Sequence, residues 1–215
     1  MNILIVAATA IEIKPFLQYL KKRKDEADID VLITGIGLTA TTYSLTKHFT
    51  IKKPDLVIQA GVAGCFDSLV ELGEVLMIKQ DTIADQSVVE LKKLKTLFDL
   101  NLVPHDQHPY TSGWLINPLN RFLGLPGIKQ VKGISVNQIS TSAEMIKFYR
   151  KTFNPVTESM EGAALHYVCL IENIPFIQLR SISNYIGERN KKKWDMQDSI
   201  KNLNKELIKL VKKVS

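Results

Sequence analysis

Residues 158–185 read ESMEGAALHYVCLIENIPFIQLRSISNY, and the organisation of the chain follows from this stretch. Apolar residues recur at helical spacing over 160–170, and a second apolar run, which reads as a strand, follows a proline. Glu161 and the Ser183-Asn184 pair stand at the ends of these two elements, where a buried element normally stays apolar. These polar side chains therefore mark a candidate site.

Each polar residue alone has an ordinary structural explanation. Glu161 fits a first-turn acid stabilised by the helix dipole, and Asn184 fits a turn at the end of a strand. The N-terminus adds a third polar point, because residues 3–7 read as a buried strand and Glu12 follows that strand closely. In open α/β sheets, ligands bind beyond the carboxyl ends of the strands. The pattern therefore predicts that Glu12, Glu161 and Asn184 share one site.

Composition bounds the class of protein. The chain has 215 residues, 45% of them hydrophobic and 23% charged, which fits one globular domain over 1–215. A net charge of +6 raises the question of a nucleic-acid partner. Much of the basic excess lies in runs at 21–24, at 191–193 and at the C-terminus, which read as solvated helix faces and ends. We therefore expect no nucleic-acid partner.

The sequence gives no indication of a membrane segment, a disulfide framework or a metal site. The apolar start lacks a basic leader region and is too short to span a bilayer, so a cytoplasmic protein without a membrane partner is expected. Cys65 and Cys169 have neither disulfide nor metal-ligand spacing. His105 and His108 lack a third ligand. We expect neither a metal nor a cofactor.

Apolar periodicity and turn residues predict an alternation of strands and helices. The expected strands are 3–7, 29–33, 55–59, 75–79, 132–136 and 176–179. The expected helices are 11–24, 39–49, 143–150, 160–170 and 195–214, with Ser142 capping the third of them. Residues 88–97 also have helical spacing, and residues 104–118 read as a polar loop. The glycines at 61 and 64 read as a turn after the third strand.

A series of short motifs occurs in one order along the whole chain, and this series resembles the nucleoside phosphorylase and nucleosidase superfamily. The resemblance is to its hydrolytic branch, which contains methylthioadenosine/S-adenosylhomocysteine nucleosidases and futalosine hydrolases. Its motifs here are Glu12, 34–37 (TGIG), 54–58 (PDLVI), 61–64 (GVAG), 72–75 (LGEV), 159–164 (SMEGAA) and 180–184 (RSISN). The resemblance implies an α/β fold, a three-layer α/β/α sandwich of the nucleoside-phosphorylase type with a central mixed sheet.

The resemblance also implies roles for the acidic residues. Glu12 is expected to act as the general base that activates a water, and Glu161 to accept hydrogen bonds from the 2′- and 3′-hydroxyls of a ribose. Met160 is expected beneath the sugar, although a buried methionine is also an ordinary core residue. Arg180 is expected to orient Glu12 or the water.

Further residues are implied as contacts of the ribose and the base. Gly61, Val62 and Ala63 are expected against both, although many nucleosidases have a serine where Val62 stands. Ile139 lies in a loop, 137–142, whose backbone contacts the base in relatives. Homodimers or larger homo-oligomers are common in the family. The loop 104–118 corresponds to a segment that covers the 5′ end of the nucleoside, sometimes that of a neighbouring subunit.

Asn184 discriminates between possible bases. Adenine-specific relatives carry Asp here, whereas the amide of Asn offers both donors and an acceptor. Its NH₂ can donate to a 6-carbonyl while its oxygen accepts from a protonated N7, with Ser183 supporting the same edge. A 6-oxopurine nucleoside fits this pattern, and adenine would set donor against donor.

Among the hydrolytic relatives, futalosine hydrolase has a hypoxanthine substrate, so the resemblance implies futalosine, hydrolysed to hypoxanthine and dehypoxanthine futalosine in menaquinone biosynthesis. Methylthioadenosine nucleosidases usually have a hairpin between the first helix and the Gly-x-Gly turn. This sequence is too short there to hold the hairpin, which favours the futalosine hydrolase branch. A methylthioadenosine/S-adenosylhomocysteine nucleosidase, a phosphate-dependent purine nucleoside phosphorylase and a nucleoside-binding protein without turnover stay open. The aromatic carboxylate of futalosine would require a cation or hydroxyls, and the sequence does not choose among its basic residues.

Overall fold

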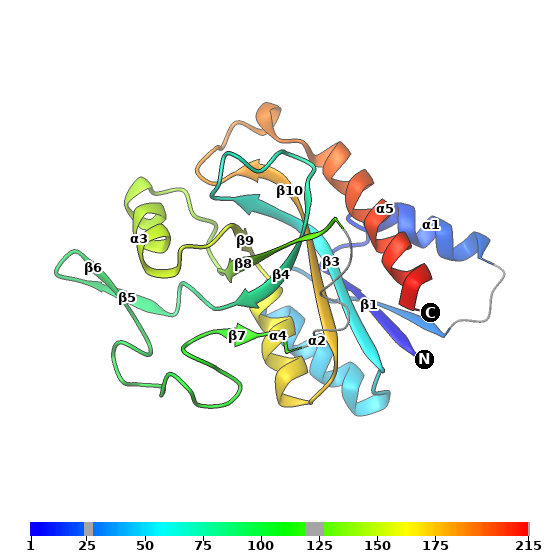
Figure 1. The fold of residues 1–215 in the computed structure, drawn as a ribbon, viewed down its shortest axis with the longest axis horizontal. Coiled ribbons are helices and arrows are strands. Elements are labelled where there is room, and N and C mark those ends of the chain that lie inside the picture. The colour runs from blue at the N-terminus through cyan, green and yellow to red at the C-terminus, as the bar shows by residue number, and fades with distance from the viewer. Residues whose placement is uncertain (24–27, 119–126, 215) are drawn as a thin grey trace.

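The computed structural model describes residues 1–23, 28–118 and 127–214, which form a mixed sheet covered by helices on both faces (Figure 1). The strands are β1 (Ile3–Ala7), β2 (Ile29–Ile33), β3 (Leu56–Cys65), β4 (Val75–Asp81), β5 (Ser87–Glu90), β6 (Lys93–Thr96), β7 (Leu115–Ile116), β8 (Lys129–Ser135), β9 (Thr157–Ser159) and β10 (Phe176–Tyr185). The helices are α1 (Lys14–Lys22), α2 (Leu38–Ile51), α3 (Ala143–Phe153), α4 (Gly162–Ile171) and α5 (Met196–Val214), with a short 3₁₀ turn η1 (Lys191–Lys193).

Four parallel strands form the centre of the sheet. β1 pairs with β2 on one side and with β3 on the other, and β3 then pairs with β10 along nearly its whole length. The apolar side chains of β1, β3 and β10 are buried because helices cover both faces of the sheet, whereas β2 at the edge is partly exposed. The carboxyl ends of β1, β3 and β10 consequently meet at one edge of the molecule.

The sheet closes on itself at that edge. β10 pairs antiparallel with β4, β4 pairs parallel with β8, and β8 pairs parallel with β9. β9 returns to the last residues of β3, where Gly64 lies opposite Glu158. Five strands therefore form a closed ring, and β1 and β2 extend the sheet beyond β3 with a free edge at β2.

Alternate residues of β1 face different helices, which gives the molecule three layers. Ile3 and Ile5 belong to a buried cluster with residues of α1 and α5, such as Phe16. Leu4 and Val6 point the other way, into a cluster with α2 and α4. Figure 1 shows α3 set apart from both pairs, near β8 and β9. The predicted α/β sandwich with a mixed sheet is confirmed.

Most predicted elements are present, and their ends differ from the predicted ends by a few residues. Ser142 caps α3, because its hydroxyl oxygen accepts a hydrogen bond from the Met145 amide at 3.4 Å. The amphipathic C-terminal helix is present as α5. α1 ends at Lys22, and the expected end at residue 24 lies outside the described residues.

Two predictions are wrong. Residues 88–97 form the hairpin of β5 and β6 instead of a helix, with Leu91 and Lys92 at positive φ in the turn. The β-branched pair Val88-Val89 favours a strand, and this outweighs the helical spacing of the lysines. The expected turn at 61–64 is instead the extended second half of β3, and neither of its glycines has positive φ.

No helix in the described part of the chain combines the length and the apolar character needed to cross a membrane.

Candidate active site

A cavity of about 370 Å³ opens where β1, β3, β9 and β10 end, within the size range of small-molecule sites. The residues that line it come from separate parts of the chain, and they include most of the side chains predicted from the sequence. They are Ala8, Thr9, Ile11, Glu12, Ile36, Val62, Ala63, Gly64, Ile139, Glu158, Ser159, Met160, Glu161, Ser183, Asn184, Ile186, Arg189, Trp194, Met196 and Ile200.

Glu12 is held in a tight turn between β1 and α1. Its Oε2 accepts hydrogen bonds from the amide and the hydroxyl of Thr9 at 3.1 and 2.9 Å, and its Oε1 accepts one from the Val62 amide at 3.1 Å. The backbone carbonyl of Glu12 accepts a bond from the Asn204 amide group at 2.8 Å, which ties this turn to α5. The carboxylate is thus fixed in orientation while it remains 9% exposed to the cavity.

Gly61 lies between Glu12 and Arg180. A Cβ at this position would clash with an Arg180 guanidinium nitrogen and would stand 3.1 Å from Oε1 of Glu12. Gly61 is therefore required because of this close approach, and not because of a turn. It lies behind the cavity wall, as does Arg180, which is 1% exposed.

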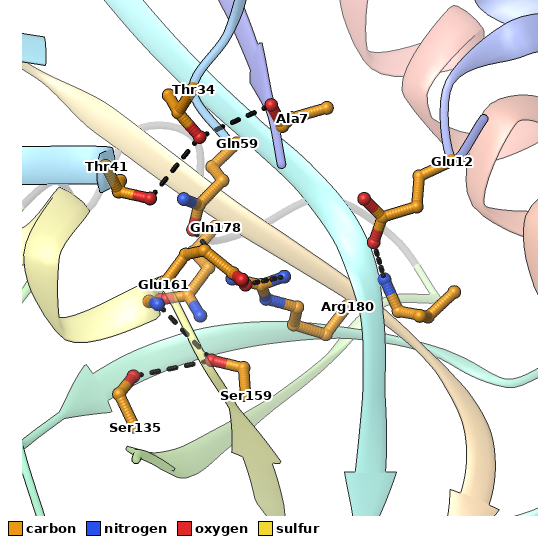
Figure 2. A network of polar contacts seen from close by, with 12 residues as sticks. Ala7, Glu12, Thr34, Thr41, Gln59, Ser135, Ser159, Glu161, Gln178 and Arg180 are labelled. Carbon is orange, nitrogen blue, oxygen red and sulfur yellow. Dashed lines mark hydrogen bonds and ion pairs between the residues drawn. The ribbon is translucent and has the colours of Figure 1, made fainter. Parts of the chain in front are cut away.

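Glu161 faces the same cavity at the N-terminus of α4. Its Oε1 accepts a bond from the Gly37 amide at 3.2 Å, and its Oε2 lies 3.4 Å from a guanidinium nitrogen of Arg180. Figure 2 shows this buried pair, with a second guanidinium nitrogen donating to Gln59 at 2.9 Å. Arg180 therefore orients Glu161. Arg180 and Glu12 form no ion pair among the described residues, and the expected role of Arg180 in orienting Glu12 or the water stays a prediction.

Asn184 and Ser183 lie at the end of β10. Oδ1 of Asn184 accepts from the Ser183 hydroxyl at 2.9 Å, and the amide nitrogen donates to the Tyr185 carbonyl at 3.2 Å. The amide keeps one N–H and one oxygen lone pair for a ligand. Its orientation is set by its own strand, so the same edge is presented to any base that enters.

Four more of the residues predicted from the sequence belong to the cavity wall. Met160, Val62, Ala63 and Ile139 all line the cavity. Their contacts with a sugar or a base stay predictions.

Thr9 was missed although the sequence carried its signal. Thr9 and Glu12 form the T-x-x-E pattern of a capping box, in which the two residues bond each other reciprocally. Glu158 was also missed, and it lies at the cavity wall with the amide and hydroxyl of Ser140 bonded to its carboxylate. Burial raises the pKa of Glu158 above its usual value. No local pattern distinguishes Glu158 from a surface acid.

The described residues contain no group of three or more potential ligands placed to hold a metal ion. Burial raises the pKa of the Cys65 thiol to about 11, so this cysteine is a neutral thiol near neutral pH.

A buried polar network supports the cavity floor from behind. Oδ1 of Asp81 accepts from the Ser135 hydroxyl at 3.0 Å, and Ser135 in turn accepts from the Ala163 amide in the first turn of α4 at 2.8 Å. Oδ2 of Asp81 accepts from the Gln178 amide group at 3.3 Å. Burial raises the pKa of Asp81 to about 7.

Protonation of Asp81 would complete this network. Burial lowers the pKa of His166 to about 4, so the ring is neutral, and its Nδ1 donates to the Leu115 carbonyl at 2.8 Å. Within the described chain, Nε2 of His166 and Oε1 of Gln178 have no hydrogen-bond partner, although the two side chains lie beside each other. If the Gln178 amide turns over, the Asp81 hydroxyl donates to Oε1 and the amide nitrogen donates to Nε2.

Replacing Asp81 by Asn is expected to change how stability depends on pH. The folded-state pKa of about 7 lies above the ordinary 3.8, so the folded protein binds more protons than the unfolded chain between these values. Wild-type stability therefore falls as pH rises through this window, and the variant lacks this loss. The free energy of unfolding is measured with urea near pH 5 and near pH 8. Between these two pH values the variant should gain about 2–3 kcal/mol in this free energy relative to wild type.

Asp106→Asn in an exposed loop is the matched control and should show no such gain. A stability difference between wild type and Asp81→Asn that stays constant between the two pH values would show that Asp81 takes up no proton on folding.

The arrangement places the carboxyl groups of Glu12 and Glu161 and the amide of Asn184 around a single cavity. Glu12 can take a proton from a water in the cavity. Glu161, whose charge is balanced by Arg180, can accept hydrogen bonds from neighbouring hydroxyls. Asn184 offers a donor and an acceptor to a planar ligand.

Comparison with known proteins places the chain among enzymes of nucleoside metabolism. The sequence description of the phosphorylase superfamily matches residues 19–215. A futalosine hydrolase of Thermus thermophilus is 24% identical over 185 residues, covering 84% of this chain and 80% of the relative. A 5′-methylthioadenosine/S-adenosylhomocysteine nucleosidase of Buchnera aphidicola is 24% identical over 205 residues, covering 94% and 85%.

Solved structures agree on the fold. The native futalosine hydrolase of Helicobacter pylori has a TM-score of 0.81 to this chain at 23% identity, with 99% of this chain and 98% of that one covered. At this identity the likeness shows a common fold, and the two sequence relatives carry names with different substrates.

Proposed function

The chain belongs to the phosphorylase superfamily, and on that premise we propose that it hydrolyses the N-glycosidic bond of a 6-oxopurine nucleoside. Futalosine is the proposed substrate, with hypoxanthine and dehypoxanthine futalosine as products. The observation that carries the proposal is that Glu12, Glu161 and Asn184 line one cavity although they come from three distant parts of the sequence. Futalosine hydrolases stand among the relatives in both sequence and structure, which supports it further.

Glu12 is the proposed general base. As the bond between C1′ and the base breaks, the sugar gains oxocarbenium character and a water attacks C1′. The Glu12 carboxylate takes a proton from that water, and its three hydrogen bonds to Thr9 and Val62 hold it in the orientation required. The electron pair of the broken bond leaves with the purine, which takes up a proton from solvent to give hypoxanthine, and Glu12 returns its proton to solvent.

Glu161 is the proposed clamp for the ribose. Its contacts with Gly37 and Arg180 fix the carboxylate and leave lone pairs free for the 2′- and 3′-hydroxyls. Negative charge beside the sugar also stabilises the cation that develops in the transition state.

Asn184 is the proposed reader of the base. Its free N–H can donate to the 6-carbonyl of hypoxanthine, and its oxygen can accept from a protonated N7. Adenine would place an amino group against the amide nitrogen, and an unpaired buried donor costs about 1–3 kcal/mol. This argument favours futalosine over methylthioadenosine, the substrate class named for the other relatives.

Hydrolysis and phosphorolysis can be separated by a direct assay. We expect hypoxanthine to appear from futalosine in phosphate-free buffer, because the Glu12 carboxylate beside β1 repels phosphate and suits a water. Futalosine, inosine and methylthioadenosine are incubated separately with the protein, and the released base is quantified by chromatography, with the Glu12→Gln protein as the blank.

Release that requires added phosphate would identify a phosphorylase. Adenine release from methylthioadenosine as the dominant activity would identify a methylthioadenosine nucleosidase. Tight binding of futalosine without release of any base would identify a nucleoside-binding protein.

Two further expectations from the sequence analysis stay predictions here. One is self-association into a homodimer or a larger homo-oligomer, and the other is a cytoplasmic location.

A further inference from the structure

Arg189 is the one cationic side chain among the described residues that line the active-site cavity. The same wall carries three acids, Glu12, Glu158 and Glu161. Of these, Glu161 is balanced from behind by Arg180. An anionic nucleoside entering this cavity would be repelled unless a cation met its negative charge. The presence of one guanidinium at the mouth of an acidic cavity is therefore informative about the ligand.

Arg189 is held in place by an aromatic side chain and not by an acid. Its guanidinium carbon lies 5.7 Å from the ring centroid of Trp194, and the Trp194 indole nitrogen donates to the Glu188 carbonyl at 3.0 Å. The neighbouring Glu188 carboxylate is paired with Lys193 at 2.7 Å. Within the described chain, Arg189 forms no ion pair, so its charge is available to a ligand.

The segment that carries Arg189 is anchored at its far end. It leaves β10 after Tyr185 and returns where the Asp195 amide donates to the Ser183 carbonyl at 2.8 Å. Trp194 precedes this anchor directly. The Arg189–Trp194 pair is therefore positioned by the same strand end that carries the proposed base reader, Asn184.

Apolar side chains continue the cavity next to this pair. Ile11 and Ile36 are 70% and 62% exposed, and Met196 at the start of α5 is 38% exposed. All three line the cavity together with Ile200. Apolar side chains exposed inside a concave site indicate a ligand that covers them with apolar surface.

We propose that Arg189 and Trp194 form a subsite for an apolar, planar arm of the nucleoside that ends in a carboxylate. This subsite rests on the nucleosidase function proposed above and specifies the substrate class of the same cavity. The guanidinium pairs with the carboxylate through two parallel N–H···O bonds, and the indole face and the neighbouring isoleucines cover the arm. A phosphate fits less well, because the described cavity wall offers no second cation for a dianion.

Replacing Arg189 by Met tests the subsite, because Met keeps an apolar side chain over Trp194 and removes the charge. Three nucleosides are compared: futalosine, its methyl ester and inosine. We expect kcat/KM for futalosine to fall about 10- to 100-fold, mainly through KM, because a hydrogen-bonded charge pair is lost. The ester and inosine should change less than about threefold, because they present no carboxylate to the guanidinium.

Two further variants sharpen the comparison. Arg189→Lys keeps the charge but loses the planar fork, so it should recover part of the loss for futalosine. Lys192→Met removes an exposed charge from the same segment and should leave all three substrates unchanged.

The proposal is overturned if Arg189→Met lowers kcat/KM equally for futalosine and its methyl ester, because the guanidinium would then act through its shape and not through its charge. It is also overturned if kcat/KM for inosine falls as strongly, or if kcat/KM for inosine 5′-monophosphate, assayed as an additional substrate, depends on Arg189 as that for futalosine does. Should wild type release no base from any nucleoside, the proposed function fails, and calorimetric Kd values for futalosine with wild type and Arg189→Met still test the subsite. Equal Kd values would overturn it, and a 10- to 100-fold weaker Kd for the variant would support it.

Discussion

Replacing Glu12 by Gln is expected to lower kcat for futalosine hydrolysis by about 1,000-fold, within the range for the loss of a general base. Gln has nearly the same shape as Glu but cannot take a proton from the attacking water. Futalosine should still bind, because the contacts proposed for the base and the ribose come from Asn184 and Glu161. Single-turnover rates and equilibrium Kd values for futalosine measure the two effects separately.

The Glu12→Gln substitution also disturbs the hydrogen bonds around residue 12, and its effect on stability must be separated from its effect on kcat. Three hydrogen-bond donors face the Glu12 carboxylate, so the NH₂ of Gln will oppose one of them. Circular dichroism and thermal unfolding establish whether the fold is intact, and Glu144→Gln on the exposed face of α3 is the matched control. A folded Glu12→Gln protein with wild-type kcat would remove Glu12 from the mechanism.

Replacing Asn184 by Asp is expected to shift the preference for the base toward adenine by about 100-fold, measured as the ratio of kcat/KM for methylthioadenosine to that for futalosine. The Asp carboxylate can accept from the 6-amino group of adenine, whereas it opposes the 6-carbonyl of hypoxanthine. The substitution removes the mismatch with adenine and creates one with hypoxanthine, and each mismatch costs about 1–3 kcal/mol. The Ser183 hydroxyl can donate to either side chain, whereas the hydrogen bond that Asn184 donates to the Tyr185 carbonyl is lost in the variant.

Asn173→Asp provides the matched control, because the same chemical change then falls on an exposed residue between α4 and β10. Its preference should equal that of wild type. An Asn184→Asp protein whose preference is also unaltered would show that another group reads the base.

The fold could be predicted from the sequence because its strong signals are local. The buried parallel strands are continuous apolar runs, and α5 repeats its apolar residues on one face. The closure of the ring through β9 could not be predicted in this way. β9 has three residues, and its pairing with Gly64 depends on contacts far apart in the sequence.

The candidate site was predicted where residue identity alone carries the chemistry. Glu12, Glu161 and Asn184 are polar residues beside buried elements, and the structure brings them to one cavity. The ion pair of Arg180 with Glu161 could not be predicted, because the two residues come from β10 and from the start of α4 and meet only in the folded structure.

The cation of the proposed carboxylate subsite escaped sequence analysis for a different reason. Arg189 stands beside a run of three lysines and looks like one more solvated charge. Only the return of its segment to Ser183, and the position of Trp194 beneath it, set it apart from those neighbours.

The closed ring of strands has an evolutionary consequence. Several residues near the proposed site belong to the paired strands of the ring: Gly61 in β3, Arg180 in β10 and the end of β9, which precedes Glu161. A change in any of them disturbs the neighbouring strands. The segment that carries Arg189 follows β10 and is not one of the ring strands, and the Asp195 amide bonds it to the Ser183 carbonyl. Selection can therefore alter which nucleoside is admitted by changing this segment, while the ring residue that holds the proposed ribose clamp, Arg180 beside Glu161, is kept.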